Sequence, residues 1–343
     1  MKRERYDIVV VGGGHAGIEA AWVAANLLPC AEGGSPTVAL VTLDPSKIGV
    51  MSCNPAIGGL AKGQLVREID AMGGLMGLIA DATGIHFKML NTSKGSAVHG
   101  PRCQNDKVEY ARVAQRAIAS RPEIAVVGGA VETIETEAVG GAGGSGRRVT
   151  GVGVRTTDGA QLRLEAPAVV LTTGTFMRGL MHTGDDKAEG GRKGEAPASA
   201  ISGALAGLGF ELGRLKTGTP PRLKRSTIDW ESLEGQPSEV PPIPFSYLNE
   251  GGSVAQKDNL ITCYKTYTNE GTHDIVRAHA HELPEYESGG GKGAGPRYCP
   301  SLYSKVERFG DRSGHMVWLE PEGLNTNTVY PNGISSAFPV EVQ

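Results

Sequence analysis

A glycine fingerprint near the N-terminus constrains the fold of this chain more than any other feature. Residues 6–11 (YDIVVV) form a continuous apolar, β-branched run, which is typical of a strand buried in a parallel sheet. Gly12, Gly14 and Gly17 follow at once as G-x-G-x-x-G, and residues 18–28 (IEAAWVAANLL) have the pattern of an amphipathic helix. This order predicts a strand, a tight turn and a helix whose N-terminus faces the phosphates of a dinucleotide. An ordinary strand-to-helix turn is the alternative.

The segments that follow favour FAD as the dinucleotide. Residues 37–43 (TVALVTL) predict a second strand and complete a βαβ unit. Residues 124–165 contain short segments that predict a β-meander, and residues 168–172 (AVVLT) predict another buried strand, a layout that flavoproteins share. An acidic ribose ligand should end the second strand, but Thr42 stands there. We therefore expect Asp44, or backbone groups near Thr42, to contact the ribose.

These patterns predict an α/β fold. We expect an FAD-binding, Rossmann-like parallel sheet of the glutathione-reductase type, with a β-meander and an inserted smaller α+β domain. The expected division is an FAD-binding domain at 1–216, an inserted substrate or NADH lobe at 217–296, where the sequence becomes proline-rich, and a return to the FAD domain at 297–343. Glycine runs at 139–146 and 289–295 predict flexible surface loops. Further helices are expected at residues 64–72, 106–120 and 199–207.

Composition excludes several classes of protein. The 343 residues carry a net charge of −3, so no global charge points to nucleic acid or to a membrane surface. No apolar run has the length of a membrane span, and the basic start leads directly into the fingerprint, so we expect no targeting segment. The five cysteines are odd in number and widely spaced, which argues against a disulfide framework or a zinc site and for a reducing compartment.

Cys53 lies in an unusual glycine-rich stretch, residues 51–63 (MSCNPAIGGLAKG). Pro55 and the neighbouring glycines favour exposed backbone, and Lys62 places a positive charge nearby. Such surroundings favour a reactive, accessible thiolate. Inert packing in a core is the alternative for any cysteine.

Two basic segments have both a structural and a functional interpretation. Residues 295–309 (GPRYCPSLYSKVERF) either form a solvated basic edge with a packed cysteine or bind the phosphates of a nicotinamide nucleotide and present a second thiol, Cys299. Residues 214–225 (RLKTGTPPRLKR) form either a solvated face or a contact with a phosphate backbone. Only His279 and His281 are spaced like metal ligands, and we interpret them as polar loop residues, so no metal is expected.

Taken together, these segments resemble the MnmG/GidA family, the flavoproteins that modify wobble uridines of tRNA, with a mitochondrial homologue. The segments that carry the resemblance are GGGHAGIEAA, MSCNPAIGGLAKGQLVREIDAMGG, GIHFKMLNTSKGSAV, VVLTTGTF, RLKTGTPPR, TNEGTHDIVR, GPRYCPS and LEPEGLNTNTVYPNGIS. They span the whole chain in order, and MSCNPAIGG and GPRYCPS are highly specific. The insertion at 29–36, the two glycine runs and Cys103 depart from the family pattern.

The resemblance implies an FAD enzyme that acts with a GTPase partner at C5 of uridine 34. It adds a carboxymethylaminomethyl or taurinomethyl group, with methylenetetrahydrofolate as the carbon source and NADH as the reductant. A thiolate that adds at C6 gives C5 the enolate character that it needs as a nucleophile. Cys53 and Cys299 are the two implied catalytic thiols, and their division of labour stays open.

The resemblance also implies binding residues. For FAD these are Gly12, Gly13, Gly14, His15, Ala16, Gly17, Asp44, Val131, Thr173 and Gly174. For NAD they are Gly295, Pro296, Arg297, Tyr298, Lys305 and Phe309. For tRNA they are Arg214, Lys216 and Arg222. A homodimer without membrane association is expected, in the bacterial cytoplasm or an organellar matrix.

The resemblance covers only the N-terminal half of the family, which continues with the rest of the flavin domain and a long helical region. We therefore interpret the chain as an N-terminal fragment. Two alternatives stay open: a folate- and FAD-dependent tRNA uridine methyltransferase, and a catalytically idle FAD-binding module.

Overall fold

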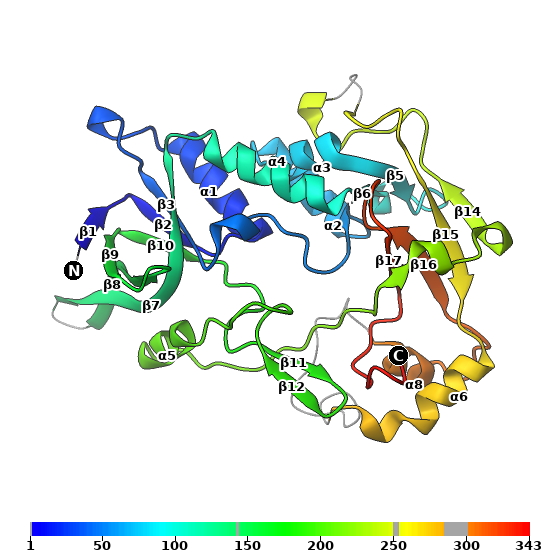
Figure 1. Ribbon diagram of the computed structural model, residues 1–343. Helices are drawn as coiled ribbons and strands as arrows, with labels where there is room; N and C mark the ends of the chain where they lie inside the picture. Colours follow the sequence, from blue (N-terminus) through cyan, green and yellow to red (C-terminus); the bar gives the residue numbers. More distant parts are fainter. Residues whose placement is uncertain (1, 142–143, 250–253, 285–300) are drawn as a thin grey trace.

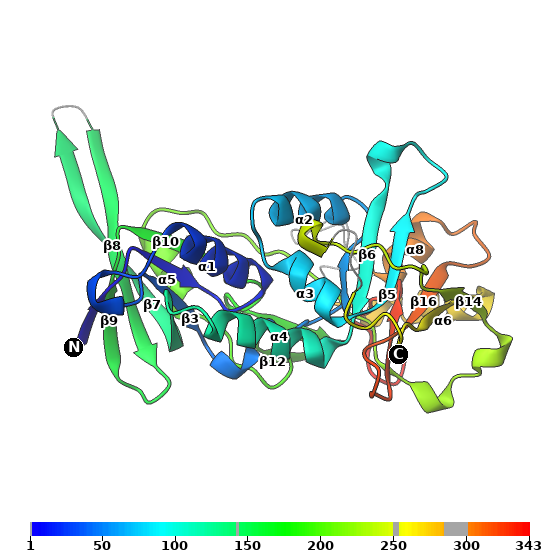
Figure 2. The same ribbon diagram turned by 90° about the horizontal axis from the view of Figure 1, so that it is seen from above.

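The computed structural model describes residues 2–141, 144–249, 254–284 and 301–343. The molecule is elongated, with a large sheet near the N-terminus at one end and a smaller antiparallel sheet near the C-terminus at the other (Figures 1 and 2). Helices and a third sheet lie between them.

The large sheet has seven strands, and its centre is parallel. In spatial order the strands are β1 (Lys2–Arg5), β9 (Gln161–Glu165), β8 (Gly144–Thr156), β7 (Ile124–Gly141), β3 (Val38–Thr42), β2 (Ile8–Val11) and β10 (Ala168–Leu171). Strands β10, β2, β3 and β7 run parallel, and β7, β8 and β9 form the antiparallel meander. Every residue of β3 is buried, including Thr42, as expected for a mostly apolar strand in the middle of a parallel sheet.

Helices cover both faces of this sheet. On one face α1 (His15–Leu27) and α4 (Lys107–Ala119) enclose a core with Leu40 and Tyr110, together with α3 (Met76–Thr83). On the other face the short helix α5 (Ala200–Gly207) packs Ile201 against the meander. Helix α2 (Lys62–Ala71) lies beside α3 (Figure 2).

A three-stranded sheet connects the two ends of the molecule. It consists of β4 (Ala56–Gly58), β6 (Gly100–Asn105) and β5 (Gly84–Leu90), all antiparallel. This sheet and α3 are absent from the sequence-based expectations. Strand β4 has only three residues and β6 contains glycine and proline, so no local period indicates them, whereas residues 85–89 of β5 do alternate between apolar and polar.

The five-stranded antiparallel sheet departs from the expected return to the FAD domain at residue 297. Its order is β13 (Leu223–Lys224), β17 (Thr328–Asn332), β16 (Met316–Pro321), β15 (Thr262–Tyr267) and β14 (Glu234–Pro237). Strands from 217–296 and from 297–343 thus share one sheet. The reason is a common core, in which Val317 and Val329 pack with Trp230 and Tyr264. Helices α6 (Glu270–Ala278) and α8 (Leu302–Arg308) lie beside it.

The remaining elements are short. They are the hairpin β11 (Leu180–Thr183) and β12 (Asp186–Glu189), and the 3₁₀ turns η1 (Glu32–Gly34), η2 (Pro45–Lys47), η3 (Ser96–Val98), η4 (Arg225–Thr227), η5 (Trp230–Ser232), η6 (Tyr247–Asn249) and η7 (Ala280–Glu282). None of the helices in the described ranges is long and apolar enough to cross a membrane.

The helices expected at 64–72, 106–120 and 199–207 are confirmed as α2, α4 and α5. The first glycine run differs from the expected loop. Residues 139–141 and 144–146 extend the hairpin of β7 and β8, with Val139 paired to Gly146, and the hairpin projects from the body (Figure 2). Each of residues 139–141 pairs with a residue of β8, and this backbone pairing keeps the glycines in strand conformation. The second run, 289–295, lies outside the described residues.

Candidate dinucleotide site and the Cys53 loop

The three fingerprint glycines each meet a different physical requirement. Gly12 has φ +114°, and a Cβ there would lie 2.3 Å from the carbonyl oxygen of Thr172. A Cβ on Gly17 would lie 1.7 Å from the carbonyl oxygen of Gly12, so the helix can approach the turn only without one. A Cβ on Gly14, in contrast, would meet nothing within 4 Å. Gly12 and Gly17 allow the turn, and Gly14 leaves open space in front of it.

The N-terminus of α1 faces that open space with free donors. Gly14 is the N-cap of α1, and no side chain accepts a hydrogen bond there. Four backbone N–H groups begin every helix without an intrahelical partner, and with the helix dipole they attract anions. The turn therefore has the donors, the space and the backbone shape that a pyrophosphate needs.

Other residues expected at this site surround the turn. Thr172 donates from Oγ1 to the carbonyl oxygen of Val11 (2.8 Å), which places Thr173 and Gly174 directly beside the fingerprint. Asp44, two residues beyond β3, accepts from the backbone N–H of Ser46 (2.8 Å). Hydrogen bonding from the side chain of Ser46, and then from its backbone, lowers the pKa of Asp44. Its carboxylate is therefore charged and lies just beyond the end of β3.

Two expected FAD residues point elsewhere. The side chain of Val131 is buried in the core under the meander, so only its backbone could contact a ligand. His15 packs its ring edge against Tyr110, with centroids 5.3 Å apart, and burial lowers its pKa. The neutral imidazole of His15 therefore contributes no charge. Ala16 is exposed at the first turn of α1.

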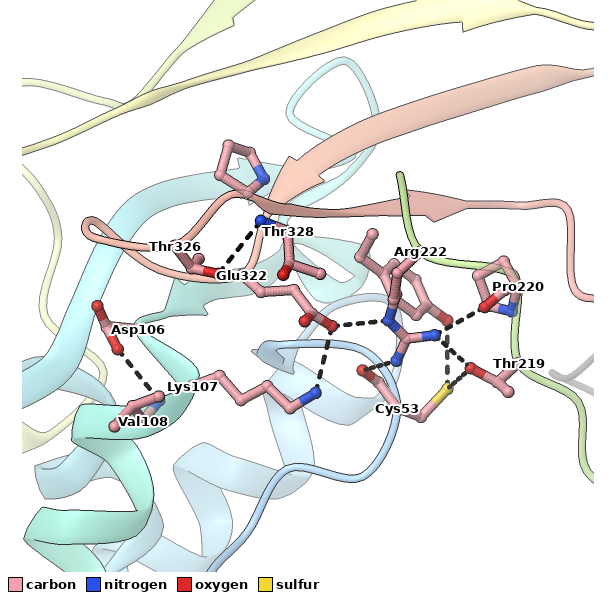
Figure 3. A network of polar contacts seen from close by, with 12 residues as sticks. Cys53, Asp106, Lys107, Val108, Thr219, Pro220, Arg222, Glu322, Thr326 and Thr328 are labelled. Atoms are coloured by element: carbon pink, nitrogen blue, oxygen red, sulfur yellow. Dashed lines mark hydrogen bonds and ion pairs between the residues drawn. The ribbon is translucent and has the colours of Figure 1, made fainter. Parts of the chain in front are cut away.

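The Cys53 loop starts at the fingerprint. The backbone N–H of Gly49 donates to the carbonyl oxygen of Gly13 (3.0 Å), and Met51 is buried in the core next to α1. Cys53 itself is partly exposed. Its Sγ lies 3.2 Å from Oη of Tyr330 and 3.8 Å from Oγ1 of Thr219 (Figure 3). The thiol thus lies on the loop that leads from the large sheet to β4, against the five-stranded sheet at Tyr330.

Arg222 organises the surroundings of this thiol. Its Nη2 donates to the carbonyl oxygen of Cys53 (3.2 Å) and its Nε to Glu322 (2.8 Å). Its Nη1 donates to Thr219 (2.7 Å), and the guanidinium lies 4.7 Å from the ring centroid of Tyr330 (Figure 3). Arg222 was expected to contact tRNA, but its donors are engaged within the protein.

A second charged pair supports the loop from the three-stranded sheet. Arg102 on β6 donates to Glu320 on β16 (2.7 Å) and contacts the side-chain oxygen of Asn54 (3.4 Å). Glu320 is only 3% exposed, and burial raises its pKa. Lys107 on α4 completes the set through Glu322 (3.3 Å). Side chains from α4, β6 and the five-stranded sheet therefore converge on residues 53 and 54.

Several expected site residues are not brought to this thiol. Cys299, Gly295, Pro296, Arg297 and Tyr298 lie outside the described residues. The remaining members of the expected sets take other positions: Lys305 donates from α8 to the carbonyl oxygen of Gly333 (2.5 Å), Phe309 packs on Arg312, and Arg214 donates to the carbonyl oxygen of Arg178 (3.1 Å). Burial lowers the pKa of Lys305.

Tyr330, Glu322 and Thr219 are functional candidates that the sequence did not single out. They lie within RLKTGTPPR and LEPEGLNTNTVYPNGIS, so their segments were noticed without a role. Tyr330 is 277 residues from Cys53 along the chain, and no spacing rule reaches that far. Among the residues that the structure describes, no group of three His, Cys, Asp or Glu side chains could hold a metal ion.

The fold and the site define an α/β protein of Rossmann-like architecture that presents a cysteine loop beside its glycine turn. Residues 7–343 match the family model described as glucose inhibited division protein A, and the chain belongs to that family. It is 49% identical, over its full length, to the tRNA uridine 5-carboxymethylaminomethyl modification enzyme MnmG of Rhodopirellula baltica. It is 50% identical, over 98% of its length, to MnmG of Granulibacter bethesdensis. The chain spans about half the length of these curated relatives.

Solved structures agree with this assignment. Two crystal forms of Aquifex aeolicus GidA superpose with TM-scores of 0.85 and 0.82, at 43% and 42% identity. They match 99% and 98% of this chain, and the match covers 54% and 51% of the Aquifex chains. The expected family and the expected α/β fold with a parallel sheet are thereby confirmed.

Proposed function

We propose that this chain binds FAD and supplies the Cys53 thiol in the modification of the wobble uridine of tRNA at C5. The observation that carries the proposal is the hydrogen bond between Gly49 and Gly13, which anchors the cysteine loop directly on the dinucleotide turn. The names of the relatives support the substrate, since both are tRNA uridine 5-carboxymethylaminomethyl modification enzymes.

The residues present fit FAD. The uncapped N-terminus of α1 and the open space at Gly14 would hold the pyrophosphate, and Asp44 would contact the ribose. When bound, the flavin supplies the redox chemistry by which the one-carbon unit from methylenetetrahydrofolate is transferred, with NADH as reductant. Lys305 and Phe309 remain proposed contacts of the nicotinamide nucleotide.

Cys53 acts on the uracil ring. The thiolate electron pair forms a bond to C6, and the electrons of the C5–C6 double bond move to C5 and the C4 carbonyl. C5 then forms its bond to the one-carbon electrophile. Loss of the C5 proton and departure of the sulfur restore the double bond and the thiolate. This is covalent catalysis by a cysteine, the side chain that is most nucleophilic near neutral pH.

The proposal also includes tRNA, a GTPase and a second copy of the chain as partners. Arg214 and Lys216 are proposed tRNA contacts, whereas we assign Arg222 to holding the Cys53 loop. The GTPase partner and the homodimer belong to the proposal through the resemblance alone. The two relatives come from bacteria, which favours the bacterial cytoplasm over an organellar matrix.

The test has two readouts on the same 343-residue chain. FAD titration of the purified chain should give a bound flavin spectrum. Expression in a bacterial strain without its own modification enzyme should restore the modified wobble nucleoside, measured by mass spectrometry. The Cys53→Ser variant should keep FAD and lose the modification. Cys30→Ser is the matched control, because Cys30 is also partly exposed but lies outside the loop.

Three outcomes contradict the proposal. A chain that binds no FAD is not a flavoprotein. A chain that binds FAD without restoring the nucleoside is an idle FAD-binding module. A Cys53→Ser variant that still modifies tRNA shows that Cys53 is not the nucleophile.

A further inference from the structure

We propose that the hydroxyl group of Tyr330 donates a hydrogen bond to the Cys53 thiolate and thereby keeps this sulfur in its reactive, charged form. The inference rests on the proposed role of Cys53 and adds a catalytic residue to it, because Tyr330 touches the reacting atom. Figure 3 shows Cys53 and Arg222 side by side, and Oη of Tyr330 lies 3.2 Å from the sulfur.

The geometry favours Tyr330 as the principal donor. Its Oη is 3.2 Å from the sulfur, whereas Thr219 Oγ1 and the carbonyl oxygen of Gly218 are each 3.8 Å away. Tyr330 is 4% exposed, so water competes little for its hydroxyl. A thiolate only accepts hydrogen bonds, and a carbonyl oxygen only accepts them too. Of the three neighbours, therefore, only the two hydroxyls can stabilise the charged sulfur.

Arg222 sets the direction of the second hydroxyl. Its Nη1 donates to Thr219 Oγ1 (2.7 Å), so that oxygen is already an acceptor and its own proton is free to point at the sulfur. The same guanidinium donates to the carbonyl oxygen of Cys53 and lies over the ring of Tyr330. Arg222 is therefore a positioning residue for both donors.

Tyr330 keeps its own proton in this arrangement. Burial raises the pKa of Tyr330, and the neighbouring sulfur raises it further. The thiol proton therefore leaves to solvent, the S–H electron pair stays on sulfur, and the phenol remains a neutral donor.

The charged groups around the thiol are balanced in favour of an anion. Arg222 reaches it from the segment before β13, and Glu322, after β16, is paired with Arg222 and with Lys107 of α4. Behind Tyr330, Glu320 of β16 is paired with Arg102 of β6. Three cations thus face two carboxylates, and a thiolate brings this set to neutrality.

The test is the pH dependence of Cys53 alkylation in the 343-residue chain. Iodoacetamide reacts with thiolates, and peptide mass spectrometry reports Cys53 separately from the other cysteines. Removal of a hydrogen bond to a charged group lowers the equilibrium constant for forming the charged group by about tenfold. The Tyr330→Phe variant should therefore react about tenfold more slowly at pH 7, with the midpoint moved up by about one pH unit. The control is Tyr264→Phe, on β15 of the same sheet. Because the ring of Tyr264 packs on Trp230, this variant should leave the alkylation rate and the midpoint of Cys53 unchanged.

A second measurement does not depend on the folding of the variant. Chain prepared with 3-fluorotyrosine has a more acidic phenol at position 330, which is a stronger donor, so its midpoint should move down. The same label in the Tyr330→Phe chain should produce no shift. An unchanged midpoint in both Tyr330→Phe and the fluorinated chain overturns the inference. Because neither tRNA nor FAD is added, this result is independent of the outcome for the proposed function.

Discussion

Individual side chains differ in how far the local sequence fixes their role. Gly12, Gly14 and Gly17 were correctly identified as a tight turn, because the strand, the glycine spacing and the helix that define it lie within a few residues of one another, although the close neighbour of Gly12 is the distant Thr172. Arg222 was expected on a tRNA-binding face and instead holds the carbonyl oxygen of Cys53 and the carboxylate of Glu322. A basic residue looks the same in the sequence whether its partner is solvent, phosphate or a distant carboxylate.

Gly14→Ala is predicted to weaken FAD binding without unfolding the protein. Its φ of −77° suits any residue and the added Cβ meets no protein atom, so the methyl group occupies only the space in front of the helix N-terminus. Loss of close phosphate approach should lower FAD affinity by about tenfold or more. Flavin titration and thermal unfolding together check this.

Gly203→Ala in α5 is the matched control, since its Cβ also meets nothing within 4 Å. It should bind FAD normally and gain up to about 1 kcal/mol in stability. Equal FAD affinity in Gly14→Ala and the unsubstituted chain would place the pyrophosphate elsewhere.

One of the contacts between the three-stranded and the five-stranded sheet is a buried histidine. His86 of β5 is 1% exposed, and its Nε2 bonds to the carbonyl oxygen of Gln236 on β14 (3.1 Å). Burial lowers the pKa of His86 to about 4, with the positive charges of Arg102 and Lys88 adding to the effect. The three-stranded sheet is thus joined to the five-stranded sheet by a neutral imidazole.

Protonation of His86 should therefore destabilise the fold in mild acid. The folded-state pKa lies below the unfolded value of about 6.5, so the stability is present above pH 6.5 and is lost as the pH falls towards 4. Between pH 7.5 and 5 the loss from this group should be about 2 kcal/mol. Urea unfolding at both pH values should show a smaller difference for His86→Gln than for the unsubstituted chain.

His281→Gln, at an exposed position in η7, should retain the full difference. If His86→Gln loses as much stability as the unsubstituted chain between the two pH values, then His86 is not the group that titrates.

At the scale of the whole molecule, α4 contacts the loop between β16 and β17. One oxygen of Asp106 accepts from the backbone N–H groups of Val108 and Glu109 (3.1 Å each) and so caps α4. The other accepts from the backbone N–H of Leu324 (3.0 Å), between β16 and β17. Since Glu322 lies beside this contact, docking of the C-terminal sheet also completes the surroundings of Cys53.

Asp106→Asn is predicted to lose one of these two functions, because an amide has only one acceptor oxygen. Asp106→Ala should lower the unfolding free energy by about 2 kcal/mol and Asp106→Asn by about 1 kcal/mol. Hydrogen exchange should show faster exchange in Asp106→Ala at both the start of α4 and Leu324, and in Asp106→Asn at one of them.

Asp158→Ala, in the exposed turn between β8 and β9, is the control and should change neither region. Unchanged exchange at Leu324 and at α4 in both Asp106 variants would show that this contact does not dock the sheet.

The sequence by itself determined the βαβ unit, its glycine turn, the meander and the helices α2, α4 and α5, since apolar periodicity and turn chemistry act between near neighbours. It also identified Cys53 through the composition of its loop. Only the tertiary structure decided that residues after 297 join the strands of the inserted lobe, and that Tyr330, Arg222 and Glu322 surround the thiol. The contacts around the thiol join residues 100 or more positions apart, and their partners are chosen by packing and charge in three dimensions, which no local pattern records.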